Sequence, residues 1–177
     1  MTRYRSTGAQ RRSLGLPADE TLENRIQYDV RRLEFTVATL RNIMEDPKRK
    51  VLVLTLRRKH AEQIMEKTMG FTKPKLLLGG TAFVPSDLTD VDVVISTYQL
   101  VSEGFDCPHL NTILCAMPKG DLVQVIGRVT RGGIGQVTPW IVDILDADEY
   151  DAVNKFNRRK AQYRALKIEL LESSLVS

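Results

Sequence analysis

Apolar residues in the first part of the chain recur at intervals of three and four positions, the spacing of one face of a helix. The stripe runs through Leu22, Ile26, Val30, Leu33, Val37, Leu40 and Met44. Pro17 precedes it at a position that proline favours near a helix start, and Asp46 and Pro47 end it. The pattern predicts one long amphipathic helix that packs on a sheet, with a coiled-coil partner as the alternative.

Short, mostly apolar runs follow, and they predict strands. The runs occupy residues 51–56, 75–78, 91–95, 112–116 and 138–142. The first run is broken only by Thr55, which suits a strand covered on both faces, as in a parallel sheet. Helical patterns lie between the runs at 60–69 and after them, where Val153, Phe156, Tyr163, Leu166 and Leu170 mark an apolar side. This alternation predicts an α/β domain with a mostly parallel sheet covered by helices on both faces.

Composition narrows the class of protein. A length of 177 residues suits one domain, and 42% hydrophobic with 27% charged residues is ordinary for a globular chain. No apolar run approaches the length of a membrane span, and no apolar segment follows the basic N-terminus as in a secretory signal. Cys107 and Cys115, with His60 and His109, are too few for a disulfide framework or a metal site. We expect a reducing, intracellular compartment, the cytoplasm or the nucleus.

Charge is modest overall but unevenly distributed. The net charge is +4 and the isoelectric point about 9.1. An acidic patch comes late in the chain, at Asp143, Asp146, Asp148, Glu149 and Asp151. A basic helix follows it, with Lys155, Arg158, Arg159, Lys160, Arg164 and Lys167. These cations predict either contact with a phosphate backbone or a solvated helix face.

The segment from Gln124 to Arg131 has the most specific chemistry. Arg128 and Arg131 are three residues apart, so on a helix they project from one face, where an anion between them relieves their repulsion. Arginine suits phosphate because its planar fork donates in pairs and remains charged. Gly127 either allows close backbone approach or fits where a side chain would clash. The alternative is a solvated helix with two surface arginines, capped by Asp121 and Gln124.

Two segments together resemble the superfamily 2 helicases. Ser96 and Thr97, followed by the run Glu103, Gly104, Phe105, Asp106, resemble motif V of that family. The set Gln124, Gly127, Arg128 and Arg131 resembles motif VI, and the run 51–56 occupies the place of motif IV. The resemblance covers residues 51–143, the second RecA-like domain of such motors. The amino-acid sequence of this region is most similar to those of DNA helicases of large DNA viruses and phages.

The resemblance implies three regions: a basic tail or linker at 1–16, a RecA-like domain at 17–147 that includes the leading helix, and a C-terminal basic helix and tail at 148–177. It also implies roles for residues. ATP would lie between this domain and a preceding one, with Arg128 and Arg131 reaching the γ-phosphate and Gln124 holding them. The other roles implied are nucleotide binding by Gly104, Asp106 and Gly127, and backbone contacts to nucleic acid, with DNA favoured over RNA, by Thr97 and Thr55.

The sequence contains no Gly-Lys-Ser/Thr phosphate loop and no acidic box after an apolar run. The phosphate-binding lysine and the Mg²⁺ ligands are therefore expected on an N-terminal motor domain, in cis or in trans. We expect the chain to be a fragment of a motor or one subunit of a split one, and to hydrolyse ATP negligibly alone. The alternative is a non-catalytic nucleic-acid-binding or regulatory module that keeps the helicase fold.

Overall fold

The computed structural model describes residues 2–4, 20–80, 88, 90–104, 109–131 and 137–171; within these ranges it leaves out the side chains of Thr2, Arg3, Thr130 and Arg131. The described strands form one six-stranded sheet in the order β1-β6-β5-β2-β4-β3, and every pair is parallel. They are β1 Thr2–Tyr4, β2 Val51–Thr55, β3 Pro74–Leu77, β4 Val93–Thr97, β5 Thr112–Cys115 and β6 Trp140–Asp146.

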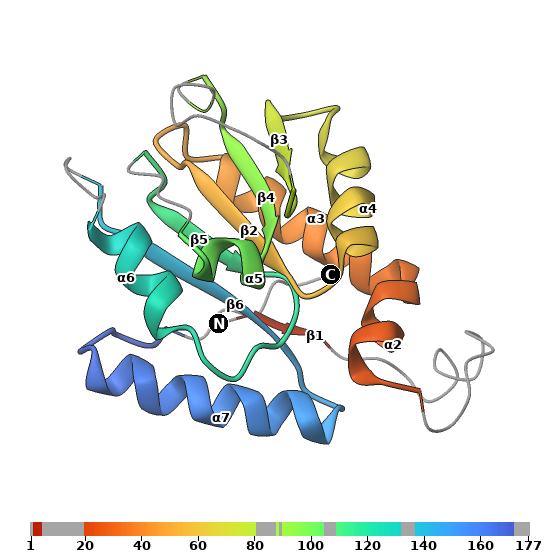
Figure 1. Ribbon diagram of the computed structural model, residues 1–177, viewed down its shortest axis with the longest axis vertical. Coiled ribbons are helices and arrows are strands. Elements are labelled where there is room, and N and C mark those ends of the chain that lie inside the picture. The colour runs from red at the N-terminus through yellow and green to blue at the C-terminus, as the bar shows by residue number, and fades with distance from the viewer. Residues whose placement is uncertain are drawn as a thin grey trace.

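Helices cover both faces of this sheet. They are α2 Leu22–Tyr28, α3 Val30–Met44, α4 Arg58–Thr68, α5 Tyr98–Ser102, α6 Val123–Arg131 and α7 Tyr150–Ala165. Figure 1 shows α5 and α6 in front of the sheet, with α7 below it, and α3 behind the strands, with α4 to the right. Tyr163 of α7 packs in the same buried cluster as residues of α5 and α6, and Ile64 of α4 in the same cluster as residues of α3. The predicted α/β fold, with a parallel sheet covered on both faces, is confirmed.

The prediction of one long leading helix was wrong, because the apolar stripe is divided between α2 and α3 at Asp29. This residue has extended backbone (ψ 100°) and caps α3, its carboxylate accepting from the Arg32 N–H at 3.0 Å. The other carboxylate oxygen accepts from the Tyr4 hydroxyl at 3.0 Å. Apolar spacing continued through the break and could not reveal it. The predicted helix start at Pro17 lies outside the described residues.

Two predicted boundaries also differ from the structure. Part of the expected N-terminal tail, Thr2–Tyr4, is an edge strand paired with Ile144–Asp146 of β6. Tertiary contacts hold it, since the Tyr4 ring packs 5.4 Å from that of Phe35. Strand β6 itself continues to Asp146, so two members of the predicted acidic patch lie inside the sheet and are buried.

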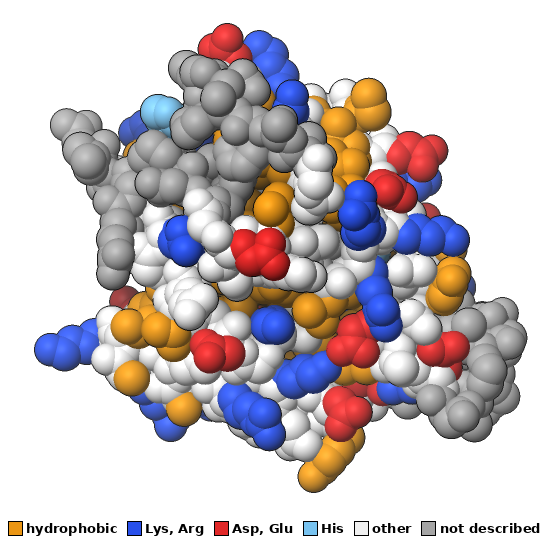
Figure 2. Space-filling model, in the orientation of Figure 1, with side chains coloured by type: hydrophobic (Ala, Val, Ile, Leu, Met, Phe, Trp, Pro, Cys, Tyr) orange, Lys and Arg blue, Asp and Glu red, His pale blue; other side chains and the backbone are white. Residues whose placement is uncertain are grey.

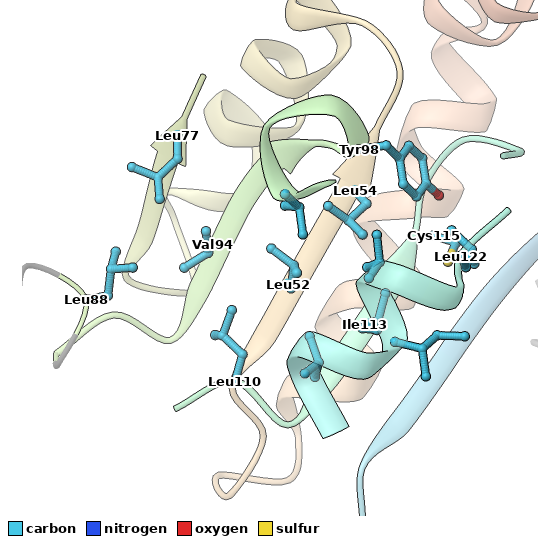
Figure 3. Close-up of a cluster of buried hydrophobic side chains, with 14 of the residues drawn as sticks. Leu52, Leu54, Leu77, Leu88, Val94, Tyr98, Leu110, Ile113, Cys115 and Leu122 are labelled. Atoms are coloured by element: carbon cyan, nitrogen blue, oxygen red, sulfur yellow. The ribbon is translucent and has the colours of Figure 1, made fainter. Parts of the chain in front are cut away.

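Side chains of each strand alternate between two hydrophobic clusters. Leu52 and Leu54 of β2 face the α5, α6 and α7 side, whereas Val51 and Val53 face α3 and α4. Figure 3 shows the first cluster, in which leucines of the central strands lie against Tyr98 and Leu122. Burying each such leucine contributes about 1.5–3 kcal/mol. Cys115 belongs to the same cluster, and burial raises the pKa of its thiol to about 12.

Strand β6 also carries two buried ion pairs, one on each face. Arg32 of α3 donates to the Asp146 carboxylate through Nε at 2.6 Å and Nη2 at 3.2 Å. Arg159 of α7 donates to the Asp143 carboxylate through Nε and Nη2, both at 2.7 Å. Positions three apart on a strand point to opposite faces. The two pairs therefore attach the helices of both layers to one strand.

Candidate functional site

The carboxyl ends of β2 and β4 bring two predicted site residues together. Thr55 ends β2 and Thr97 ends β4, and the two are paired in register. They contribute to a hollow of about 680 Å³ at this edge of the sheet, where open α/β folds bind ligands. It is lined by Thr55, Leu56, Arg58, Gly79, Thr97, Tyr98, Gln99, Leu100, Ser102, Glu103 and Lys119.

Thr97 is placed to contact a ligand in this hollow. It is half-buried and caps α5, its hydroxyl oxygen accepting from the Leu100 N–H at 3.4 Å. A hydroxyl that accepts in this way still has a proton to donate. Thr97 can therefore hold the start of α5 and offer a hydrogen bond to an anionic oxygen at the same time.

Thr55 is used internally instead. It is fully buried, and its hydroxyl lies 2.9 Å from Nδ1 of His60. Burial, with the charge of Arg32, lowers the pKa of His60 from 6.5 to about 3, so the imidazole is neutral near pH 7. This arrangement gives Thr55 no exposed surface, and its predicted contact with nucleic acid stays a prediction. His60 is a contact residue of the strand end.

The segment that resembles motif V is described only in part. Gly104 follows α5 with φ +137°, a conformation that side chains rarely adopt, so glycine is required for this turn. Asp106, predicted to bind nucleotide, lies outside the described residues. The predictions for both residues stay untested by the geometry.

Helix α6 carries all four residues that resemble motif VI. Gln124 is exposed in its first turn, and Gly127 and Arg128 are half-buried. A Cβ added at Gly127 would meet nothing within 4 Å, so within the described part of the chain no clash requires glycine there. The first alternative, close approach by another molecule, stays open. Arg131 is the last residue of the helix, and its side chain lies outside the described atoms.

Arg128 connects the two helices of this region. Its Nη2 donates to the Ser102 carbonyl oxygen, at the end of α5, at 3.4 Å. Together with the open space beside Gly127, a half-exposed guanidinium fits an anion that approaches α6 from outside the domain. Such an anion could be the phosphate tail of a nucleotide.

The predicted cap of α6 differs from the observed one. The helix begins at Val123, and the Asp121 carboxylate accepts from the Val123 N–H at 3.0 Å. The loop before it is held by α7: Arg159 Nη1 donates to the Lys119 carbonyl, Gln162 Oε1 accepts from the Leu122 N–H at 3.0 Å, and Gln162 Nε2 donates to the Gly120 carbonyl at 3.3 Å.

The sequence patterns did not predict these contacts between α7 and the loop. Arg159 was counted among exposed cations of a basic helix, yet it is fully buried. Burial by itself lowers the pKa of its guanidinium, but the adjacent Asp143 carboxylate outweighs this and raises the pKa overall. The sequence offers one sign that this face of α7 is buried, which is Tyr163, four residues after Arg159. The Tyr163 hydroxyl donates to the same Asp143 carboxylate at 3.0 Å.

The described residues show neither a metal site nor a membrane-spanning helix. They contain no group of three or more His, Cys, Asp or Glu side chains that could hold a metal ion. Within the same ranges, no helix has the length and apolar character needed to cross a membrane.

Comparison with known proteins agrees with the fold. No protein-family profile matches the chain. In sequence, it is 30% identical over 71 residues to a protein of Acanthamoeba polyphaga mimivirus described as an ATP-dependent RNA helicase. The match covers 40% of this chain and only 14% of that relative.

Solved structures share the fold at low identity. T4 UvsW matches 98% of this chain with a TM-score of 0.70 and 14% identity, over 40% of its own length. The C-terminal domain of the DEAD-box protein Dbp5 matches 81% of this chain and 83% of its own, with a TM-score of 0.63 and 18% identity. The Pyrococcus furiosus Hef helicase domain matches 78% of this chain and 32% of its own, with a TM-score of 0.55 and 17% identity. The chain therefore shares the fold of the Dbp5 C-terminal domain, of T4 UvsW and of the Hef helicase domain, and part of its sequence is similar to that of a viral protein described as a helicase.

Proposed function

We propose that this chain is the C-terminal half of an ATP-dependent nucleic-acid helicase or translocase. The observation that carries the proposal is the link between α5 and α6. Thr97 begins α5, and Ser102 at its end accepts from Arg128 of α6. Thr97, the proposed contact to nucleic acid, is thereby connected through α5 to Arg128, the proposed contact to the phosphates of ATP. A motor requires such a connection between its two ligands.

In this proposal Arg128 and Arg131 act on ATP held by an N-terminal motor domain, which also supplies the Mg²⁺ ligands. Prepositioned cations stabilise negative charge that shifts among the phosphate oxygens during hydrolysis. In other nucleotide hydrolases an arginine of this kind contributes about 10³–10⁵ in rate. Gln124, exposed in the first turn of α6, orients the arginines or contacts the other domain, and Gly104 and Asp106 bind the nucleotide.

The nucleic-acid contact rests on Thr97, whose hydroxyl proton is available in the hollow. Contacts of this kind go to the sugar–phosphate backbone and do not depend on base sequence. We propose DNA as the substrate. The mimivirus relative is named as an RNA helicase, so both nucleic acids belong in the test.

The test combines this chain with any phosphate-loop motor domain that the same locus encodes, fused or as a separate protein. ATP hydrolysis is measured with and without single-stranded DNA or RNA. We expect stimulated hydrolysis from the combination, a loss of at least about 10³-fold in Arg131→Ala, and no effect of Arg164→Ala, an exposed arginine of α7.

Two results would contradict the proposal. One is clear ATPase activity from the pure chain that Arg131→Ala abolishes. The other is failure of any such motor domain to gain stimulated hydrolysis from the chain, and this result would favour the non-catalytic module.

A further inference from the structure

A second hollow adjoins the first along the same edge of the sheet. It has a volume of about 720 Å³ and lies between α2, the loop before α6, and α7. The two hollows share Leu56 and Lys119. Its lining is Glu23, Leu56, Pro118, Lys119, Gly120, Asp121, Lys155, Arg158, Ala161 and Gln162. A ligand that follows the first hollow past Lys119 would therefore enter the second.

The charges around the second hollow are not all balanced. Lys155 is paired with Glu23 at 2.7 Å, and this bond outweighs the effect of burial and lowers the pKa of the Glu23 carboxyl. Lys119 and Arg158 form no ion pair with any described residue. Figure 2 shows Lys and Arg side chains among acidic ones over the part of this face between α5, α7 and α2.

The structure divides the cations of α7 into three groups. Arg159 is buried against Asp143 and has a structural role. Lys155 and Arg158, three residues apart on one helix face, line the second hollow. Half-buried Lys160, exposed Arg164 and exposed Lys167, which lies just after the helix, line neither hollow. The basic helix is thus neither a uniform binding stripe nor a uniform solvated face.

The residues around Arg158 are held in place by hydrogen bonds. Its neighbour Arg159 is bound to Asp143 by two hydrogen bonds, and Gln162 is bound to the loop on the other side of the hollow. The stem of Arg158 lies over that loop, its Cδ being 3.8 Å from where a Cβ of Gly120 would stand. The exposed guanidinium therefore needs little further ordering to bind an anion.

We propose that a single strand of nucleic acid continues from the Thr97 hollow past Lys119 into the second hollow, where Lys119 and Arg158 bind its phosphates. This inference rests on the proposed function for the nucleic acid itself and adds the path that it takes. A strand fits better than a single phosphate because the two hollows are continuous. A strand is favoured over an acidic peptide because Lys119 also lines the hollow that holds Thr97, the proposed contact to a nucleic-acid backbone.

The test measures binding of a labelled, short homopolymer of single-stranded DNA or RNA to the intact chain over a range of salt concentrations. Loss of one phosphate contact lowers the slope of log affinity against log salt by about 0.7 for a single strand. We expect this decrease, without base preference, in Arg158→Gln and in Lys119→Gln, and about twice the decrease in the double variant. Arg164→Gln is the matched control: the same residue type on the same helix, exposed, with the same change of charge.

The outcomes separate the inference from the proposed function. If the wild-type chain binds neither polymer at low salt, both fail. If it binds and Thr97→Val weakens binding, but Arg158→Gln and Arg164→Gln behave alike, only the path is wrong. Competition by free phosphate or ATP, or by polyglutamate, as effective as by the unlabelled strand would replace the strand with those ligands and overturn the inference.

Discussion

The two faces of the sheet bury similar arginine–aspartate pairs on β6, but the remaining hydrogen bonds of the two arginines differ. Besides Asp146, Arg32 donates to Thr36 Oγ1 and to the Ala116 carbonyl, both inside the domain. Besides Asp143, Arg159 donates to the Lys119 carbonyl in the loop that lines both hollows. One pair holds the fold together, and the other also fixes the loop that leads to α6.

This difference follows from what covers each face. The α3 and α4 face presents Leu33, Leu40, Val53, Ile64 and similar side chains, a closed apolar layer. The opposite face has a comparable core, but its polar contacts continue outward through Gln162 to the loop at residues 119–122. A buried pair can therefore be purely structural on one face and position a candidate site on the other.

The largest effect is expected from Arg32→Ala. Removing one member of a buried pair leaves Asp146 charged and unpaired, which costs about 3–5 kcal/mol in the free energy of unfolding. Chemical denaturation measures this loss. Arg31→Ala, an exposed arginine one position earlier, is the control and should change stability by less than about 0.5 kcal/mol. Equal effects of the two variants would show that the buried pair is not what stabilises this face.

An intermediate loss of stability is expected on lowering the pH, because His60 of α4 is buried. The pKa of His60 is about 3 when folded and near 6.5 when unfolded, so between these values the unfolded chain binds more protons. Stability due to His60 is thus complete above pH 6.5 and decreases as the pH falls, by up to about 1.4 kcal/mol per unit.

The check is the pH dependence of unfolding. The slope of stability against pH in this window should be smaller in His60→Asn than in the wild type, because asparagine has no group that titrates there. Identical slopes in the two proteins would mean that His60 protonates without unfolding, and the α4 face would then be less closed than we describe.

The smallest effect is expected from Gln162→Leu, which removes the two hydrogen bonds that Gln162 makes to the loop and leaves the bond from Arg159 to the Lys119 carbonyl in place. We expect a loss of about 1 kcal/mol, concentrated near Leu122, where the amide should exchange hydrogen faster than in the wild type. Gln162→Glu keeps the acceptor for the Leu122 N–H and should give a smaller change. Faster exchange throughout the sheet would contradict the local role of this contact.

Sequence patterns were sufficient to predict the fold class, because a parallel sheet covered on both faces requires strands that are apolar on both sides. Runs such as 112–116 are apolar without alternation, and the intervening helices show their own period. The pairing of Thr55 with Thr97 could be expected only in outline, since the register of β2 with β4 depends on contacts between segments far apart in the chain.

The sequence by itself determined the parallel α/β architecture and the placing of Gln124, Gly127, Arg128 and Arg131 on one helix, because both depend on local periodicity and spacing. Only the tertiary structure decided which charges are buried. Asp143 and Arg159 look like members of an acidic patch and a basic helix, yet they pair inside the domain, while Arg158, the next residue along, lines an open hollow. The physical reason is that the desolvation of a charge depends on its partners across the fold, and those partners lie outside any local window of sequence.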